Sequence, residues 1–163
     1  MGNTVISWDE YFMNVAKLSA FRSKDPNTQV GCCIVNENKK IVGVGYNGMP
    51  WGCKDEDFPW DKREGSLYDT KYPYVVHAEL NAILNSTTDL HGCTLYVSLF
   101  PCNECTKAII QSGIKHIVYE DDKYNGTETD RAAKRMLDAC GITYTKLELE
   151  YSIMLKKEIK IKK

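Results

Sequence analysis

The second half of the sequence alternates short apolar segments with longer amphipathic ones, and this alternation constrains the fold more than any other feature. Short apolar runs rich in β-branched residues are typical of strands, whereas apolar residues three or four apart are typical of helices. Parallel strands need a crossover connection, which a helix between them provides. The sequence therefore predicts an α/β fold in which helices pack on a largely parallel sheet. The expected elements are helices over 77–85, 102–112 and 127–139, and strands over 93–98, 116–119 and 142–145.

The first part of the chain predicts one helix and a β-hairpin. The stretch Ser7-Trp8-Asp9-Glu10 has the pattern of a capping box, in which the Ser and Glu side chains bind free N–H groups at a helix start. A helix should therefore begin at Trp8, and it should end before Pro26, which cannot continue it. Strands over 30–35 and 40–46 follow, joined by a short polar turn, so we expect a hairpin here.

One domain over residues 1–163 is expected, because no repeat, low-complexity block or linker divides the chain. Its core should cover about residues 8–146. Residues 49–74 form a long irregular insertion, and loops of this length inside compact domains are often functional. Residues 147–163 form a Lys-rich tail, which we expect to be a solvated end rather than an interaction tail.

Composition and charge make several classes of protein improbable. The net charge is −1 and the pI is about 6.3, whereas a polynucleotide binder normally shows a basic excess, so no DNA or RNA partner is expected. No apolar run is long enough to span a membrane, and the N-terminus lacks the features of a signal peptide. Seven cysteines are an odd number for a disulfide framework. We therefore expect reduced thiols in a cytoplasmic protein.

Three residues suited to bind zinc stand at expected helix starts. Cys102 and Cys105 follow Pro101 at a spacing that lets both thiols face one point. The positive end of the helix dipole stabilises thiolate, the form of cysteine that binds zinc. His77 stands at the start of another expected helix and supplies a third ligand. Because no convincing fourth ligand is found, we expect one catalytic Zn²⁺ per chain, with a position left for water.

Glu79 follows His77 closely within an otherwise apolar stretch. It should face the metal site without binding the ion, and a carboxylate beside a metal-activated water can accept a proton and pass it on. The H-x-E and P-C-x-x-C motifs together are those of zinc-dependent nucleobase deaminases. A redox CxxC pair, a core histidine and a structural zinc site are alternative interpretations of the separate motifs.

Four longer stretches make the resemblance more specific. KDPNTQVG, GYNGMP, DTKYPYVVHAELNAI and LFPCNECTKAIIQSGIKHIVY closely resemble the deoxycytidylate (dCMP) deaminases, a branch of the cytidine and deoxycytidylate deaminase superfamily. The resemblance implies a three-layer α/β/α sandwich with a five-stranded mixed sheet, in which the first strand runs against the others. It also implies a hydrolase acting on a cyclic amidine C–N bond, which converts dCMP and water into dUMP and ammonia and so supplies dUMP for thymidylate synthesis.

The same resemblance implies roles for further residues. Asn47 should contact the deoxyribose, the Ala78 backbone N–H should hold the base carbonyl, and Tyr124 should close over the nucleotide. Asn47 also suits a turn in its own right. The 5′-phosphate also needs cations, and Arg22 and Lys24 are the candidates because they lie in the loop after the first helix, near the turn that should face the site. Their alternative interpretation is plain surface charge, since cations are favoured at a helix C-terminus.

Members of this family are typically hexamers that are activated by dCTP with Mg²⁺ and inhibited by dTTP. The resemblance therefore implies a homohexamer with an effector site near Tyr46 and Gly48. The aromatic-rich insertion is equally well interpreted as an oligomer interface. Three other functions stay open: another zinc deaminase acting on nucleosides or nucleobases, a polynucleotide-editing deaminase, and a zinc module without catalysis.

Overall fold

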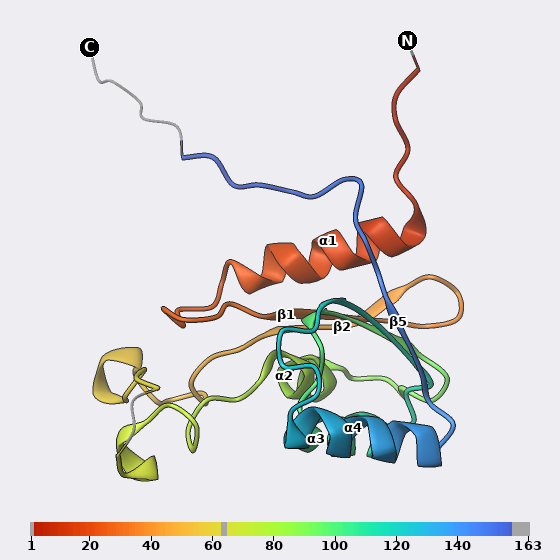
Figure 1. Ribbon diagram of the computed structural model, residues 1–163. Coiled ribbons are helices and arrows are strands. Elements are labelled where there is room, and N and C mark those ends of the chain that lie inside the picture. Colours follow the sequence, from red (N-terminus) through yellow and green to blue (C-terminus); the bar gives the residue numbers. More distant parts are fainter. Residues whose placement is uncertain (1, 63–64, 158–163) are drawn as a thin grey trace, which may run out of the picture.

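The computed structural model describes residues 2–62 and 65–157, and these form a five-stranded mixed sheet between two layers of helices (Figure 1). This confirms the predicted α/β/α sandwich. The end of the predicted Lys-rich tail, 158–163, lies outside the described residues. The helices and strands are α1 (Trp8–Ala20), β1 (Gly31–Val35), β2 (Ile41–Tyr46), α2 (Ala78–Asn85), β3 (Thr94–Leu99), α3 (Asn103–Gln111), β4 (His116–Asp121), α4 (Glu128–Ala139) and β5 (Thr143–Lys146).

The strand order is β2-β1-β3-β4-β5. β1 is antiparallel to both of its neighbours, and β3, β4 and β5 are parallel, so the first strand runs against the others, as predicted. β2 consequently points in the same direction as β3 and β4. The segments that follow β2, β3 and β4 therefore meet at one edge of the sheet, together with the segment that enters β1. Ligands of open α/β sheets bind at this kind of edge.

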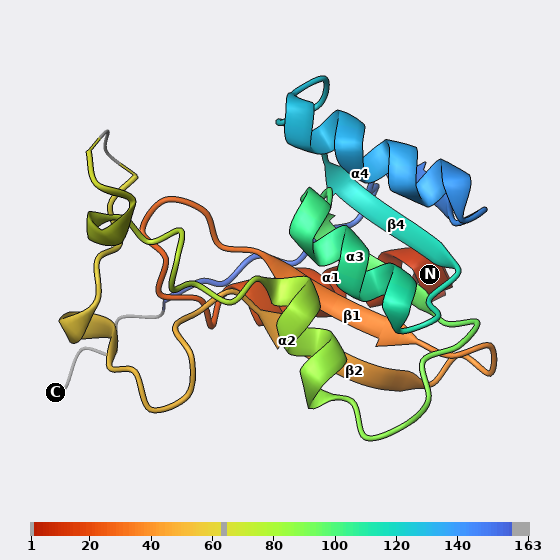
Figure 2. The same ribbon diagram turned by 90° about the horizontal axis from the view of Figure 1, so that it is seen from below.

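The two faces of the sheet carry separate apolar cores. α2, α3 and α4 cover one face, and α1 covers the other (Figures 1 and 2). Because successive side chains of a strand point to opposite faces, Cys32 and Ile34 of β1 belong to the first core, whereas Cys33 packs with Phe12 and Met13 of α1. Because helices cover both faces of β1, its sequence is apolar at every position.

Two glycines in β2 allow α2 to lie directly on the sheet. A Cβ atom on Gly43 would be 2.6 Å from the Ala82 carbonyl oxygen, and a Cβ atom on Gly45 would be 2.4 Å from the Ala78 carbonyl oxygen. Contacts this short are not tolerated, so any larger residue would push the helix away. The first turn of α2 is thereby held against the end of β2.

The ends of α1 follow the predicted chemistry. The Ser7 side chain accepts a hydrogen bond from the Glu10 backbone N–H at 3.2 Å, and the Glu10 carboxylate accepts one from the Ser7 backbone N–H at 2.9 Å. This confirms the capping box. No helix among the described residues has the length and apolarity required to cross a membrane.

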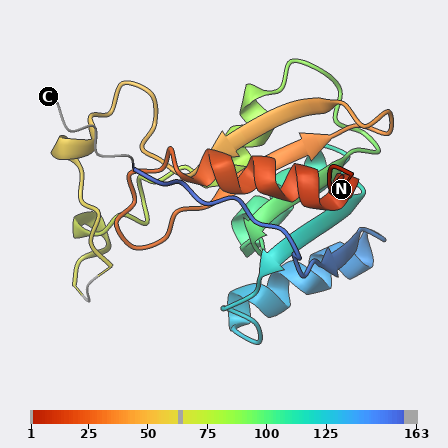
Figure 3. The same ribbon diagram turned by 90° about the horizontal axis from the view of Figure 1, so that it is seen from above.

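Two irregular segments extend from the sandwich. The described part of the insertion 49–74 contains two short 3₁₀ turns, Asp55–Asp57 and Leu67–Asp69, and lies beyond the site edge of the sheet (Figure 3). The segment after β5 returns along α1. There the Asn14 side chain donates to the Tyr151 carbonyl at 2.9 Å and accepts from the Ile153 N–H at 2.8 Å, so this first part of the predicted tail is bound to the helix.

Candidate metal centre and cleft

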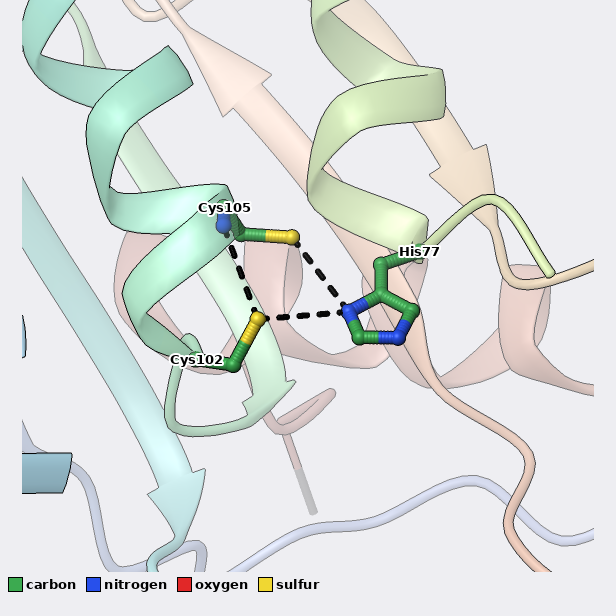
Figure 4. Close-up of side chains that lie close together, drawn as sticks. All are labelled: His77, Cys102 and Cys105. Atoms are coloured by element: carbon green, nitrogen blue, oxygen red, sulfur yellow. Dashed lines mark hydrogen bonds between the residues drawn. The ribbon is translucent and has the colours of Figure 1, made fainter. Parts of the chain in front are cut away.

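The predicted metal ligands converge on one point. The Nδ1 atom of His77 lies 3.4 Å from the Cys102 Sγ atom and 3.5 Å from the Cys105 Sγ atom (Figure 4). In a tetrahedral zinc site with ordinary bond lengths, a nitrogen and a sulfur ligand are about 3.5 Å apart. The spacing and the donor set therefore fit zinc. Within the described ranges, this is the one group of three such side chains close enough to hold a metal ion.

Two helix N-termini provide this arrangement. His77 is the N-cap of α2 and Cys102 is the N-cap of α3, and both have extended backbone angles. Both helices therefore begin one residue after the predicted starts at His77 and Cys102. Cys105 lies in the first turn of α3, and its backbone N–H points to the Cys102 sulfur at 3.5 Å. Free N–H groups and the positive helix end therefore surround the thiols.

The two thiols of the metal group differ: Cys102 favours the thiolate, whereas the contact with Cys102 and burial raise the pKa of Cys105. The Cys105 side chain, followed by the His77 ring and the Cys105 backbone N–H, lowers the pKa of Cys102 below that of a free thiol, although burial opposes this. The contact with Cys102 in turn raises the pKa of His77, again against the effect of burial. A thiolate is the form that binds zinc, and metal binding releases the protons that remain.

Glu79 is a buried carboxylate beside the metal group. It lies in the first turn of α2 and is only 4% exposed. Burial raises the pKa of Glu79 above that of an ordinary carboxyl, and the charge of His77 opposes the rise. A carboxyl with a raised pKa exchanges protons more readily near neutral pH. Glu79 is therefore suited to proton transfer at this site.

A cleft of about 360 Å³ opens from the metal group to the surface. This volume is within the range of small-molecule sites. The segments that meet at the site edge of the sheet and the end of the insertion form its walls. Six of the predicted site residues line it, namely Asn47, His77, Ala78, Glu79, Cys102 and Tyr124.

Cys105 belongs to the metal group, and the other four predicted residues lie outside the cleft lining. Arg22 and Lys24 do not line the cleft: the Arg22 guanidinium lies 6.0 Å from the centre of the Tyr46 ring, and the Lys24 Nζ atom is 2.5 Å from Asp55. Tyr46 and Gly48, the predicted effector residues, also lie outside the cleft lining. The backbone of Gly48 pairs with Val76 just before the metal group.

The side chain of Asn47 is bound to the protein around it. Its amide donates to the Asp25 carboxylate at 3.3 Å and to the Thr28 carbonyl at 3.0 Å, and its Oδ1 atom accepts from the Val30 N–H at 2.8 Å. Asn47 therefore fixes the loop that enters β1. One lone pair of Oδ1 remains beyond the bond to Val30.

The cleft also contains charged residues that the sequence analysis missed. Asp25 and Lys71 form a buried ion pair in its wall, and Lys62 lines it as well. Burial alone raises the pKa of Asp25, but hydrogen bonds from Lys71 and from the loop backbone outweigh it and lower the pKa. The Nζ atoms of Lys123 and Lys62 lie 3.1 Å and 3.5 Å from the hydroxyl of Thr28, which also lines the cleft. Asp25 and Lys71 stand in KDPNTQVG and DTKYPYVVHAELNAI, but neither stretch indicates that they meet.

An α/β/α sandwich with one His and two Cys at helix starts and a buried carboxylate beside them defines a zinc-dependent deaminase of bases. Residues 6–121 match the family described as the cytidine and deoxycytidylate deaminase zinc-binding region. The chain therefore belongs to the cytidine and deoxycytidylate deaminase family.

Individual relatives agree with this assignment. The deoxycytidylate deaminases of Pongo abelii and Homo sapiens are 58% and 57% identical over 142 residues, which cover 86% of this chain and 80% of each relative. Among solved structures, the dCMP deaminase of cyanophage S-TIM5 in complex with dCMP and dUMP superposes with a TM-score of 0.69. The two chains are 27% identical, and the match covers 89% of this chain and all of the phage chain.

Proposed function

We propose that this protein hydrolyses dCMP to dUMP and ammonia, and so supplies dUMP for thymidylate synthesis. One observation carries the proposal: a buried carboxylate and a zinc-type ligand group line a cleft that Lys62 also lines, with Lys123 near Lys62 at the Thr28 hydroxyl. The identity to deoxycytidylate deaminases and the likeness to a structure containing dCMP and dUMP support the same substrate.

In the proposed reaction, Glu79 moves the protons. His77, Cys102 and Cys105 would hold the zinc, which when bound would supply a Lewis acid for activating water. Glu79 accepts a proton from the water that attacks C4 of cytosine and delivers it to N3 of the ring, which makes C4 more electrophilic. Glu79 then accepts the proton of the new C4 hydroxyl and passes it to the amino group, which leaves as ammonia while the C4 carbonyl forms. Its burial and raised pKa support its use first as base and then as acid.

Three residues of the cleft are assigned to the nucleoside. Ala78 is the first residue of α2, where a backbone N–H has no partner within the helix, which supports its bond to the base carbonyl. The remaining lone pair of Asn47 supports a bond from a deoxyribose hydroxyl. Tyr124 is 48% exposed and lines the cleft, which supports a role in covering the nucleotide.

We assign the 5′-phosphate to Lys62 and Lys123 instead of Arg22 and Lys24. The two ammonium groups come from different loops, and both reach the Thr28 hydroxyl. Like charges held this close attract an anion between them. Lys62 lines the cleft, and Lys123 contacts Thr28, which lines it too. In contrast, Lys24 is already paired with Asp55, and the Arg22 guanidinium lies over the Tyr46 ring outside the cleft lining.

The test is ammonia release from dCMP, CMP and deoxycytidine, measured side by side with zinc-loaded protein. We expect dCMP to be the preferred substrate, and Glu79→Gln to lower its turnover by at least about 100-fold with zinc still bound. Glu104→Gln is the matched control, since Glu104 also lies in a first helical turn but is exposed and outside the cleft. No turnover of any of the three by the wild type would refute the proposal and favour the polynucleotide or non-catalytic alternatives.

We further infer regulation by dCTP with Mg²⁺ as activator and by dTTP as inhibitor, acting on a homohexamer. The cation of Arg22 beside Tyr46 supports a second nucleotide site near Tyr46 and Gly48. Sigmoidal dCMP kinetics that become hyperbolic with dCTP are expected, and kinetics unaffected by either nucleotide would refute the regulation. Sedimentation would measure the oligomer.

The seven cysteines are all free thiols, which supports a cytoplasmic location.

A further inference from the structure

The ion pair between Asp25 and Lys71 joins the insertion to the core of the protein. Lys71 is 7% exposed and Asp25 is 3% exposed. In the described part of the insertion, only Thr70 and Lys71 are buried, and no insertion residue belongs to the buried members of either apolar core. The insertion is therefore attached largely through polar contacts. Removal of one partner from a buried pair leaves an unpaired charge, so this contact holds its partners firmly.

On the core side, Asp25 fixes the loop that carries Thr28. Its Oδ1 atom accepts from the backbone N–H groups of Asn27 at 2.8 Å and Thr28 at 3.2 Å, while its Oδ2 atom accepts from Lys71 and from Asn47. The position of the Thr28 hydroxyl therefore depends on this carboxylate.

On the insertion side, Lys71 fixes the segment that carries Lys62. The backbone N–H of Lys71 donates to the Asp61 carbonyl at 3.1 Å, directly before Lys62, whose Nζ atom reaches the Thr28 hydroxyl. The contacts thus form a closed ring from Asp25 through Lys71 and Asp61 to Lys62 and Thr28. The same ion pair positions both Thr28 and Lys62, which line the cleft.

We propose that Asp25 and Lys71 form a positioning pair that sets the preference of the site for a phosphorylated nucleotide over the nucleoside. The inference rests on the proposed function, since it assumes that Lys62 meets the phosphate at Thr28. Lys71 is neutralised by Asp25, so it acts by holding the loops in place and not as the phosphate ligand. Recognition by long lysine side chains requires such support, because an unsupported site is too loose to discriminate.

The experiment measures kcat/KM for dCMP and for deoxycytidine with zinc-loaded Lys71→Met and Asp25→Asn. In both variants we expect the ratio of the two values to fall about 10- to 100-fold, the worth of one or two hydrogen bonds to a charged group. The fall should come from the KM for dCMP. Lys17→Met is the matched control, because it breaks the partly buried Lys17–Glu120 pair away from the cleft and should leave the ratio unchanged.

The sign of the Asp25→Asn effect separates positioning from direct binding. If Lys71 bound the phosphate itself, removal of the Asp25 charge would keep or raise the preference for dCMP. A double-mutant cycle with Lys62→Met gives a second test. If Lys71 acts by positioning Lys62, adding Lys71→Met to Lys62→Met should lower the ratio of the kcat/KM values little further, whereas independent roles would give additive losses.

Two results would overturn the inference: an unchanged or raised ratio in Asp25→Asn, or additive losses in the cycle. A wild type without preference for dCMP would instead refute the proposed function. Should Lys71→Met fail to fold, Asp25→Asn combined with Lys71→Met leaves no unpaired charge, and the same fall in the ratio is expected from it.

Discussion

Replacement of Gly45 by alanine tests whether the approach of α2 to β2 holds the site together. The new Cβ atom would lie 2.4 Å from both the Ala78 carbonyl oxygen and the Ala82 nitrogen, whereas real contacts of this kind are essentially never below 3.0 Å. Since both obstacles are backbone atoms, α2 must move by about 0.6 Å or more. Overpacking of this kind costs about 1–3 kcal/mol of stability. Because His77 is the N-cap of α2 and Glu79 lies in its first turn, movement of the helix also disturbs the reacting groups.

The expected loss of activity is larger than the loss of stability suggests. A misplacement of about 1 Å costs on the order of 100-fold in rate, so we expect a fall of about 10- to 100-fold in dCMP turnover by folded Gly45→Ala protein. Urea unfolding gives the stability, and competition with a chelator gives the zinc affinity, which should also fall. Ile41→Ala, at the exposed start of the same strand, is the control and should change neither activity nor zinc affinity. Wild-type zinc affinity and activity in Gly45→Ala would refute this account of α2.

Three further predictions follow from single contacts. Cys102→Ser should weaken zinc binding strongly in a competition with a chelator. The wild type should also lose zinc as the pH is lowered, because protons compete with the metal for the thiolates. Asn14→Ala should destabilise the protein by about 1–3 kcal/mol, because three hydrogen bonds to backbone groups are lost. Two of these bonds hold the segment after β5, which should therefore become open to proteases. Asp25 has a lowered pKa in the folded state, so its stabilising contribution is present above about pH 4 and is lost as the pH falls through the folded value. Urea unfolding between pH 3 and 7 should therefore show that the free energy of unfolding falls less on acidification in Asp25→Asn than in the wild type.

The metal group could be predicted from the sequence because its information is local. Cys102 and Cys105 share one helical turn, and His77 and Glu79 share the start of another, so spacing alone indicates which side chains face one point. The element order followed from apolar periodicity. The helix starts differ from the predictions by one residue at His77 and Cys102. Both are N-cap residues, which stand directly before the helix with an extended backbone, and apolar spacing does not distinguish an N-cap from the first helical residue.

The phosphate side of the cleft could not be predicted in this way. Lys71 meets Asp25 across a separation of 46 residues, and Lys62 meets Thr28 across 34. These contacts depend on how an irregular segment packs, and such a segment has no periodicity that indicates which side chains face inward. Arg22 and Lys24 are predicted from their place in the loop after the first helix, but this loop lines the cleft with Asp25 and Thr28 instead.

The hydrogen bonds between α1 and the segment after β5 have a consequence for folding during synthesis. α1 leaves the ribosome before every strand of the sheet, but Asn14 obtains its last partner only when Ile153 has been made. The local β1–β2 hairpin and α2 can associate much earlier. The face of the sheet beneath α1 is therefore completed only after the segment behind β5 has emerged, so a nascent chain stalled after β4 should hold α1 less tightly than a chain that includes this segment.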